Sequence, residues 1–278
     1  MGSAASRFSR ALTAELYPTS TYRHNSGGEP TAIPELTWEG LRGFHAAHYH
    51  PSNARFFSYG DLPLAETLAQ AQAAALSRFE PLPAATLQAA QVTDEVRFDR
   101  PRRASITVPA DPVVADPAKQ HCVSVAWLLL NQATEADPFE NFALAVASNL
   151  MLAGPQAAFY EPLIATGLGS GFAPGTGYGS DKKESSFAVG LKNVSAEATA
   201  EVEAAIDGTL RRLARDGFPR AHVDAVVHQI ELDEREVSPS FGLGVGVSCM
   251  SSWLHGGDAL RPLRTAEMAA RLSARLDA

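Results

Sequence analysis

The sequence predicts an α+β fold, with two-layer domains in which helices cover a largely antiparallel sheet. Apolar strand patterns lie close together at His121–Leu130, just before Gly179, and at Ser186–Leu191. Two long amphipathic helices follow, the first after Ser195 and the second after Pro219. Strands that pair locally and are followed by long helices favour a sheet with helices on one face.

The composition limits the classes of function. The chain has 278 residues, 45% of them hydrophobic, which is enough for one large domain or two modest ones. The net charge of −8 argues against a nucleic-acid partner, because phosphate binding needs clustered Lys and Arg. No apolar run reaches the roughly 18 residues of a membrane span. Cys122 and Cys249 form no C-x-x-C pair and are predicted to be buried thiols.

The first 80 residues predict a helix, a strand and a second helix. Thr37 is a suitable N-cap, and Pro51 ends the first helix. Arg55–Gly60 is rich in aromatic residues and predicts a strand. Pro63 opens a second helix that extends to about Phe79.

A change of composition divides the chain. Residues 81–104 combine prolines with densely alternating charges, which is typical of a linker. We therefore expect three parts: residues 1–80, the linker 81–104 and a second domain of residues 105–278. The second domain is predicted to begin with a strand at Ser105–Val108.

The second domain contains further helices. Residues 138–152 predict a helix, and residues 158–166 a shorter one. Ser195 is the expected cap of the first long helix, and Gly217 its C-terminal stop. A helix rich in small residues is predicted for Gly242–His255.

A histidine cluster is the strongest candidate for a metal site. His45, His48 and His50 form H-x-x-H-x-H near a helix end, and zinc hydrolases use two histidines one turn apart. No acid lies between these histidines to act as general base, and neither H-E-x-x-H nor H-x-x-E-H occurs in the chain. We favour packing and capping roles, with a small metalloenzyme using these histidines as the least favoured hypothesis.

Two other patterns have structural interpretations. The glycine-rich stretch 167–179 fits no G-x-G-x-x-G register and no P-loop, so it predicts a tight loop entering an edge strand. Peptide contact along that strand is the functional alternative. The acidic run 231–236 ends a helix and predicts a solvated face.

The first residues fit three interpretations. Met1–Ser6 matches a short myristoylation pattern, and residues 1–12 are rich in Ser, Ala and Arg, as in a transit peptide. Both signals are short, so we favour an arbitrary start of the chain with no targeting role.

Several runs of residues, in a fixed order along the chain, form a distinctive pattern. It begins with Ser26–Pro30, Ile33–Glu39 and Phe44–Gly60. It continues with Asp116–Gln120, Gly154–Pro155, Phe159–Tyr160, Gly167–Gly169, Ser240–Leu243 and Trp253–Asp258. In these runs, from about residue 15 onward, the chain resembles the presequence protease subfamily of pitrilysin-type peptidases.

This resemblance implies an enzyme of two halves, each built from two related α+β domains, that closes around short unstructured peptides. In the family, zinc is held by the histidines of H-x-x-E-H and a later glutamate, and the glutamate of the motif activates water. Both features lie upstream of the part that this chain resembles. Residues 1–80 match the end of the first domain, and residues 105–278 match the second, non-catalytic domain.

No catalytic or metal-binding residue is therefore assigned, and the substrate-binding residues are unknown. We expect part of a zinc metalloendopeptidase, with no zinc bound by this chain alone. Its expected partners are the remainder of the peptidase and short unfolded peptides, and its expected location is the mitochondrial matrix, with a plastid as the alternative. The competing hypothesis is a stand-alone inactive module for binding or scaffolding.

Overall fold

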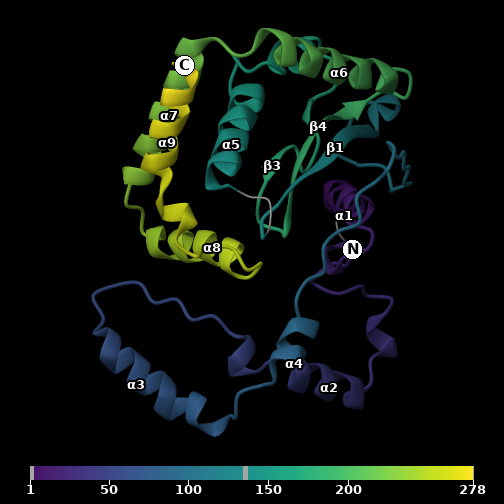
Figure 1. The fold of residues 1–278 in the computed structure, drawn as a ribbon. Helices are drawn as coiled ribbons and strands as arrows, with labels where there is room; N and C mark the ends of the chain where they lie inside the picture. Colours follow the sequence, from purple (N-terminus) through teal and green to yellow (C-terminus); the bar gives the residue numbers. More distant parts are fainter. Residues whose placement is uncertain (1–2, 134–136, 278) are drawn as a thin grey trace.

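The fold is described from a computed structural model that covers residues 3–133 and 137–277. A sheet with surrounding helices forms the larger part, here called the body (Figure 1). Residues 21–93 form a smaller lobe that carries α2, α3 and α4 (Figure 1). The helices are α1 (Ala4–Leu16), α2 (Trp38–His48), α3 (Leu64–Ala74), α4 (Ala84–Ala89), α5 (Pro138–Leu152), α6 (Thr199–Asp216), α7 (Arg220–Arg235), α8 (Phe241–Trp253) and α9 (Thr265–Leu276).

The sheet is antiparallel, as the strand patterns predict. Its strands are β1 (His121–Asn131), β2 (Gly171–Phe172), β3 (Gly177–Gly179) and β4 (Glu184–Val194). β4 lies in the middle and pairs with β1 on one side and with both β2 and β3 on the other. At the centre of the β1–β4 pair, Gly190 stands opposite Ser124, where an added Cβ would collide with the backbone of β1. The close approach of the two long strands therefore requires glycine at this position.

Two hydrophobic clusters hold the body together. In the first, α6 packs on the sheet and fully buries side chains from the strands, the π-helical turn Tyr160–Ala165 and α6 itself. In the second, α5 packs against α7 and α9. Each fully buried aliphatic or aromatic side chain contributes about 1.5–3 kcal/mol. The largest members of the first cluster are Phe159, Leu163, Phe187, Leu191 and Ile206.

Local sequence signals place several elements correctly. The side chain of Asp137 accepts a hydrogen bond from the Phe139 backbone N–H, and α5 starts at Pro138 as predicted. Thr37 caps α2 by accepting from the Gly40 N–H. Gly217 follows the last residue of α6 with a φ of 71°, in the left-handed region that favours glycine.

Other predictions are wrong in detail. Arg55–Gly60 and Ser105–Val108 were expected as strands, but no described strand pairs with either segment. Without a neighbouring strand, strand propensity alone does not make a strand. α6 begins at Thr199, because the Ser195 hydroxyl instead accepts from the Ala198 N–H in a preceding turn.

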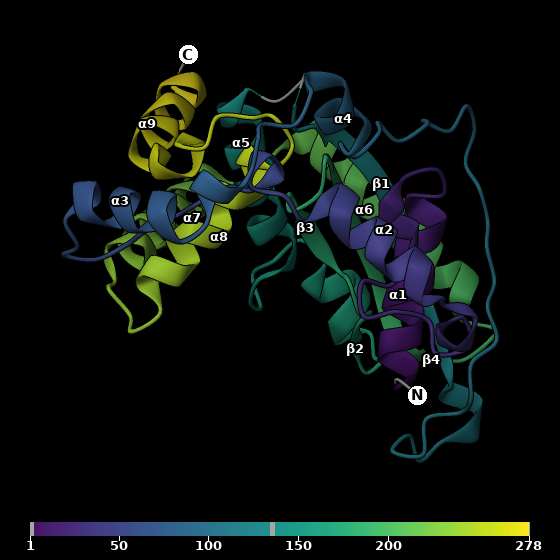
Figure 2. The same cartoon turned by 90° about the horizontal axis from the view of Figure 1, so that it is seen from below.

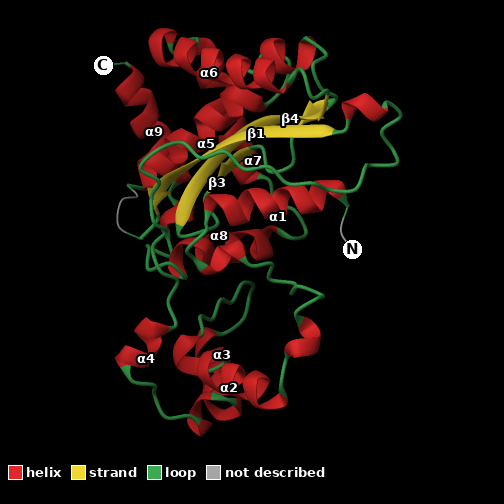
Figure 3. Ribbon diagram, turned by 90° about the vertical axis from the view of Figure 1, so that its right-hand side faces the viewer, coloured by secondary structure: helices red, strands yellow, loops and turns green. Residues whose placement is uncertain are grey.

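The N-terminal helix is a further difference from expectation. α1 and α8 lie on one side of the sheet and α6 lies on the other (Figure 3). α1 ends at Leu16 and leads into Tyr17, and both side chains are buried. Residues 3–16 are therefore part of the body. Of the myristoylation pattern Met1–Ser6, Met1 and Gly2 lie outside the described residues, whereas Ser3 caps α1 and residues 4–6 form its first turn.

Candidate functional site

The predicted histidine cluster lies in the lobe and is spread over its surface. His45 and His48 are exposed on α2, and the His45 ring stacks on the Tyr49 ring with 4.9 Å between the ring centres. The Nδ1 atom of His50 accepts a hydrogen bond from the Ser52 N–H at 3.1 Å, so it caps the turn that follows. Across residues 3–133 and 137–277, no group of three or more His, Cys, Asp or Glu side chains is placed to hold a metal ion.

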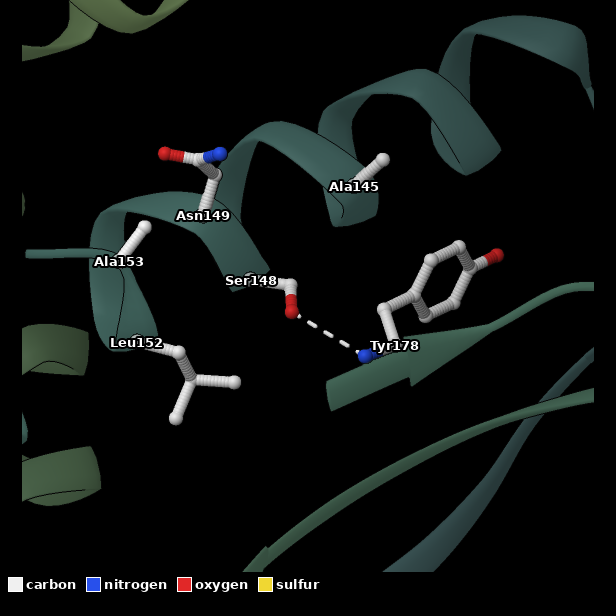
Figure 4. A pocket seen from close by; sticks show the side chains of 6 residues that line it. All are labelled: Ala145, Ser148, Asn149, Leu152, Ala153 and Tyr178. Atoms are coloured by element: carbon white, nitrogen blue, oxygen red, sulfur yellow. Dashed lines mark hydrogen bonds between the residues drawn. The ribbon is translucent and has the colours of Figure 1, made fainter. Parts of the chain in front are cut away.

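The glycine-rich stretch forms the edge strands β2 and β3 beside α5. A pocket of about 280 Å³ lies between α5 and β3, with Ala145, Leu152 and Tyr178 among its lining residues. Ser148 points from α5 toward β3 and accepts a hydrogen bond from the Tyr178 backbone N–H at 3.1 Å (Figure 4). A peptide strand adding to this edge would need that N–H, which Ser148 already occupies. The pocket lining also contains no acid or histidine that could activate the Ser148 hydroxyl.

The acidic run lies where the sequence predicts, at the exposed C-terminal end of α7. Glu231 is partly buried, and Asp233, Glu234 and Glu236 are exposed. Asp233 accepts a hydrogen bond from Gln229 one turn earlier. This pattern is that of a solvated helix end.

A polar cluster that no sequence motif marks lies where the lobe joins the body; Glu95, Ser20 and Glu184 are buried in it, and Thr19 and Asp94 are exposed at its margin. We call it the junction cluster. Its members come from both ends of the lobe, from β1 and β4, and from the segment after α8: Tyr17, Thr19, Ser20, Tyr22, Asp94, Glu95, Asn131, Lys183, Glu184 and His255.

Glu95 is the centre of the junction cluster. Its side chain is 5% exposed, and its carboxylate accepts hydrogen bonds from the Thr19 hydroxyl at 2.6 Å and from the backbone N–H groups of Thr19 and Ser20 at 3.0 and 2.8 Å. Burial raises the pKa of the Glu95 carboxyl, but the hydrogen bonds from Thr19 and Ser20 outweigh burial and lower the pKa below its usual value. Glu95 therefore ties the two ends of the lobe together as a carboxylate.

Glu184 connects the two ends of the lobe to the sheet. Its Oε1 atom accepts from the Glu95 backbone N–H at 2.9 Å, and its backbone carbonyl accepts from the Tyr17 hydroxyl at 2.8 Å. Lys183, the preceding residue, forms an ion pair with Asp94 at 2.7 Å. The ammonium of Lys183 and the amide of Asn131 lower the pKa of the Asp94 carboxyl.

The remaining contact reaches the segment after α8. The Tyr22 hydroxyl lies 3.0 Å from Nε2 of His255 and accepts from the Lys183 backbone N–H at 3.1 Å. Burial raises the pKa of Tyr22 to about 12, and it lowers the pKa of His255. Both side chains are therefore neutral at pH 7. The hydrogen bonds of the junction cluster are made within the fold, so its geometry suits positioning of the lobe better than acid–base chemistry.

A second pocket, of about 400 Å³, lies between the lobe and α8. Phe57 of the lobe forms one wall, and Leu243, Val247 and Met250 of α8 line it as well, so the lining is mainly apolar. In the described part of the chain, no helix combines the length and the apolar character needed to cross a membrane.

Known proteins share this architecture. A solved protease from Helicobacter pylori superposes on 90% of this chain and 56% of its own, with a TM-score of 0.58 and 18% identity, which establishes a shared fold. Residues 35–230 match the family described as the peptidase M16 inactive domain. The chain belongs to the peptidase M16 family.

Curated relatives make the likeness more specific. The mitochondrial presequence protease of Xenopus tropicalis is 40% identical over 264 residues, which cover 95% of this chain. The mitochondrial presequence protease of Mus musculus is 41% identical over 257 residues, or 92% of this chain. The chain spans about a quarter of the length of these relatives, 25% and 24% respectively.

Proposed function

We propose that this chain is the non-catalytic part of a zinc metalloendopeptidase that degrades presequences and other short unstructured peptides in the mitochondrial matrix. The observation that carries the proposal is the identity of about 40% to presequence proteases over 95% of a chain that contains no H-x-x-E-H motif. The zinc ligands and the water-activating glutamate then belong to a part of the peptidase outside this sequence.

The exposed apolar side chains of the lobe support this proposal. Trp38, Leu41 and Phe44 on α2 are 57–66% exposed, and Leu64 and Leu68 on α3 are 66% and 59% exposed. Several large apolar side chains exposed on the same two helices are typical of a surface that another part of a protein covers. In the proposed arrangement, residues 1–80 belong to the end of the first peptidase domain, although α1 packs on the sheet of the second domain. Residues 81–104 link the two domains, and the remainder of the peptidase covers α2 and α3.

A chimera tests the proposal. In the mouse presequence protease, the 257-residue segment that aligns with this chain is replaced by the corresponding residues of this chain. We expect the chimera to cleave a fluorogenic presequence peptide in a zinc-dependent manner, and the purified 278-residue chain to cleave none. A folded chimera that binds zinc but does not cleave the peptide would contradict the proposal.

The body of the fold also supports a second candidate, a stand-alone module for binding or scaffolding. Its two hydrophobic clusters are complete without α2, α3 and α4. The mass of the native polypeptide, detected with an antibody against residues 180–278, separates the two candidates. A band near 29.5 kDa favours the module, and a band several times larger favours the peptidase.

A further inference from the structure

Both ends of the lobe join the body in the same region, which has the arrangement of a hinge. The chain of the lobe leaves the body after Ser20 and returns at Asp94, and both ends lie in the junction cluster. The Glu95 carboxylate bonds to Thr19 and Ser20 on the outgoing segment, while its own backbone N–H bonds to Glu184 of β4. Charge-assisted hydrogen bonds in a buried setting are strong, so these ends are firmly fixed.

The lobe has a second attachment, on α8, which we call the latch. The rings of Phe57 and Tyr59 lie against Gly246 and Gly242, where any Cβ would collide with them; a Cβ on Gly246 would come within 2.8 Å of Phe57 Cδ1. Phe57 and Tyr59 are two residues apart in an extended segment, which spans about 6.6 Å. Gly242 and Gly246 are four residues apart on a helix, which spans about 6.0 Å. The spacing of the two rings therefore matches the spacing of the two glycines.

The latch continues along α8 in both directions. The Arg55 guanidinium lies 5.3 Å from the centre of the Trp253 ring, and the Tyr59 ring lies 6.0 Å from that of Phe241. Alternate side chains of residues 55–59 thus follow α8 from one end to the other. The Phe57 ring remains 42% exposed, and the latch contains no buried hydrogen bond, so it is weaker than the junction cluster.

The helices of the lobe stand apart from those of the body. α2, α3 and α4 lie below α8 in Figure 1, and the view from below shows α2 and α4 displaced from α8 (Figure 2). Within the lobe, the His50 ring packs edge-on against the Phe79 ring with 5.1 Å between the ring centres. The Ser52 hydroxyl accepts a hydrogen bond from the Leu82 N–H at 3.1 Å. These contacts join its two halves to each other.

We propose that residues 21–93 form a hinged lid, which turns about the junction cluster and is held closed by the packing of Phe57 and Tyr59 on the glycines of α8. Opening the latch separates Phe57 from α8 and removes one wall of the 400 Å³ apolar pocket. Because the latch is weaker than the hinge, the lid opens at α8 while its two ends stay in place. This inference rests on contacts within the chain and describes the lobe while the remainder of the peptidase does not cover α2 and α3, so its failure would leave the proposed function unchanged.

Glycine variants of α8 provide a matched test. Gly246→Val places a side chain where the Phe57 ring lies, whereas Gly244→Val, on the same helix, meets open space. The two variants change helix propensity equally, so any difference between them reports on the latch. The distance across the lid is measured by electron spin resonance between labels on exposed positions 70 of α3 and 204 of α6, in a chain without its native cysteines.

We expect one narrow distance distribution for the parent chain and for Gly244→Val. For Gly246→Val we expect a shift to longer distances and a broader distribution. A label pair inside the lobe, on residues 39 and 70, separates turning of a lid from unfolding of the lobe. In Gly246→Val its distance stays unchanged if the lobe turns as a unit.

A second readout does not depend on substitution in a helix. Phe57→Ala removes the ring from the lobe side and should reproduce the effect of Gly246→Val, with circular dichroism as the check on folding. Trypsin cleavage after Arg55 should also become faster in both variants. The proposal is wrong if Gly246→Val and Phe57→Ala give the same distances as Gly244→Val, or if the pair inside the lobe changes as much as the pair across the lid.

Discussion

Replacing Glu95 by alanine is expected to destabilise the protein far more than removing an exposed acid does. Ser20 is 2% exposed, and the variant leaves its backbone N–H without an acceptor. The variant also removes the acceptor of the Thr19 backbone N–H and of the Thr19 hydroxyl. A buried donor that loses its partner costs about 1–3 kcal/mol, and loss of a charged partner costs the upper part of that range. Three hydrogen bonds to a charged acceptor are lost together, and water can replace only those of exposed Thr19, so we expect a loss of about 3–5 kcal/mol in the free energy of unfolding.

Urea unfolding monitored by tryptophan fluorescence measures this loss. Glu15→Ala is the matched control, because Glu15 forms an exposed ion pair with Arg102 and should change stability by less than about 0.5 kcal/mol. Thermal unfolding should show a decrease in midpoint of roughly 6–20 °C for Glu95→Ala. Equal stabilities of Glu95→Ala and Glu15→Ala would refute the assignment of Glu95 as the centre of the junction cluster.

The pH dependence provides an independent test of the same group. The pKa of Glu95 is lower in the folded protein than in the unfolded chain, where the pKa of a glutamate is about 4.3. Its contribution is therefore fully present above that unfolded value and is lost as the pH falls through the lower folded pKa. The stability difference between the parent chain and Glu95→Gln should shrink over this acidic interval and stay constant between pH 6 and 8. A difference that persists unchanged at the acid end would contradict the pKa assignment.

Three further predictions concern the sheet, the core and the histidines. Gly190→Ala should cost at least about 1–3 kcal/mol, because its Cβ would collide with the backbone of β1; equal urea midpoints for variant and parent would exclude the close strand contact. Phe159→Ala should cost about 3–5 kcal/mol because the ring is fully buried, whereas Phe44→Ala, 57% exposed, should lie within about 0.5 kcal/mol of the parent. Changing His45 and His48 together to alanine should leave the zinc content of the dialysed chain unchanged in elemental analysis; loss of one equivalent of zinc would restore the metalloenzyme hypothesis.

Local chemistry explains why several elements were predictable. The Asp137–Pro138 pair encodes the start of α5, and Gly217 encodes the end of α6, through interactions within a few residues. The apolar patterns at β1 and β4 likewise correspond to observed strands. The family resemblance rested on runs of residues rather than on geometry, and the comparisons confirm it.

The features that the sequence did not predict have a common physical origin, because they depend on contacts between distant segments. Arg55–Gly60 has the composition of a strand, but its aromatic side chains pack on α8 and its backbone has no partner strand among the described residues. The glycines of α8 predict a small-residue helix, yet nothing in the sequence identifies Phe57 and Tyr59 as the rings that lie against them.

The sequence alone determined the fold class, the family and the absence of an H-x-x-E-H motif, because each depends on residue identity and short-range spacing. Only the tertiary structure decided that Glu95, in a charged segment expected to be a linker, is buried between Thr19 and Glu184. These contacts join residues 76 and 89 positions apart. Composition around Glu95 predicts exposure. The residue becomes buried because the backbone N–H groups of Thr19 and Ser20, together with the Thr19 hydroxyl, supply the hydrogen bonds that compensate the desolvation of its carboxylate.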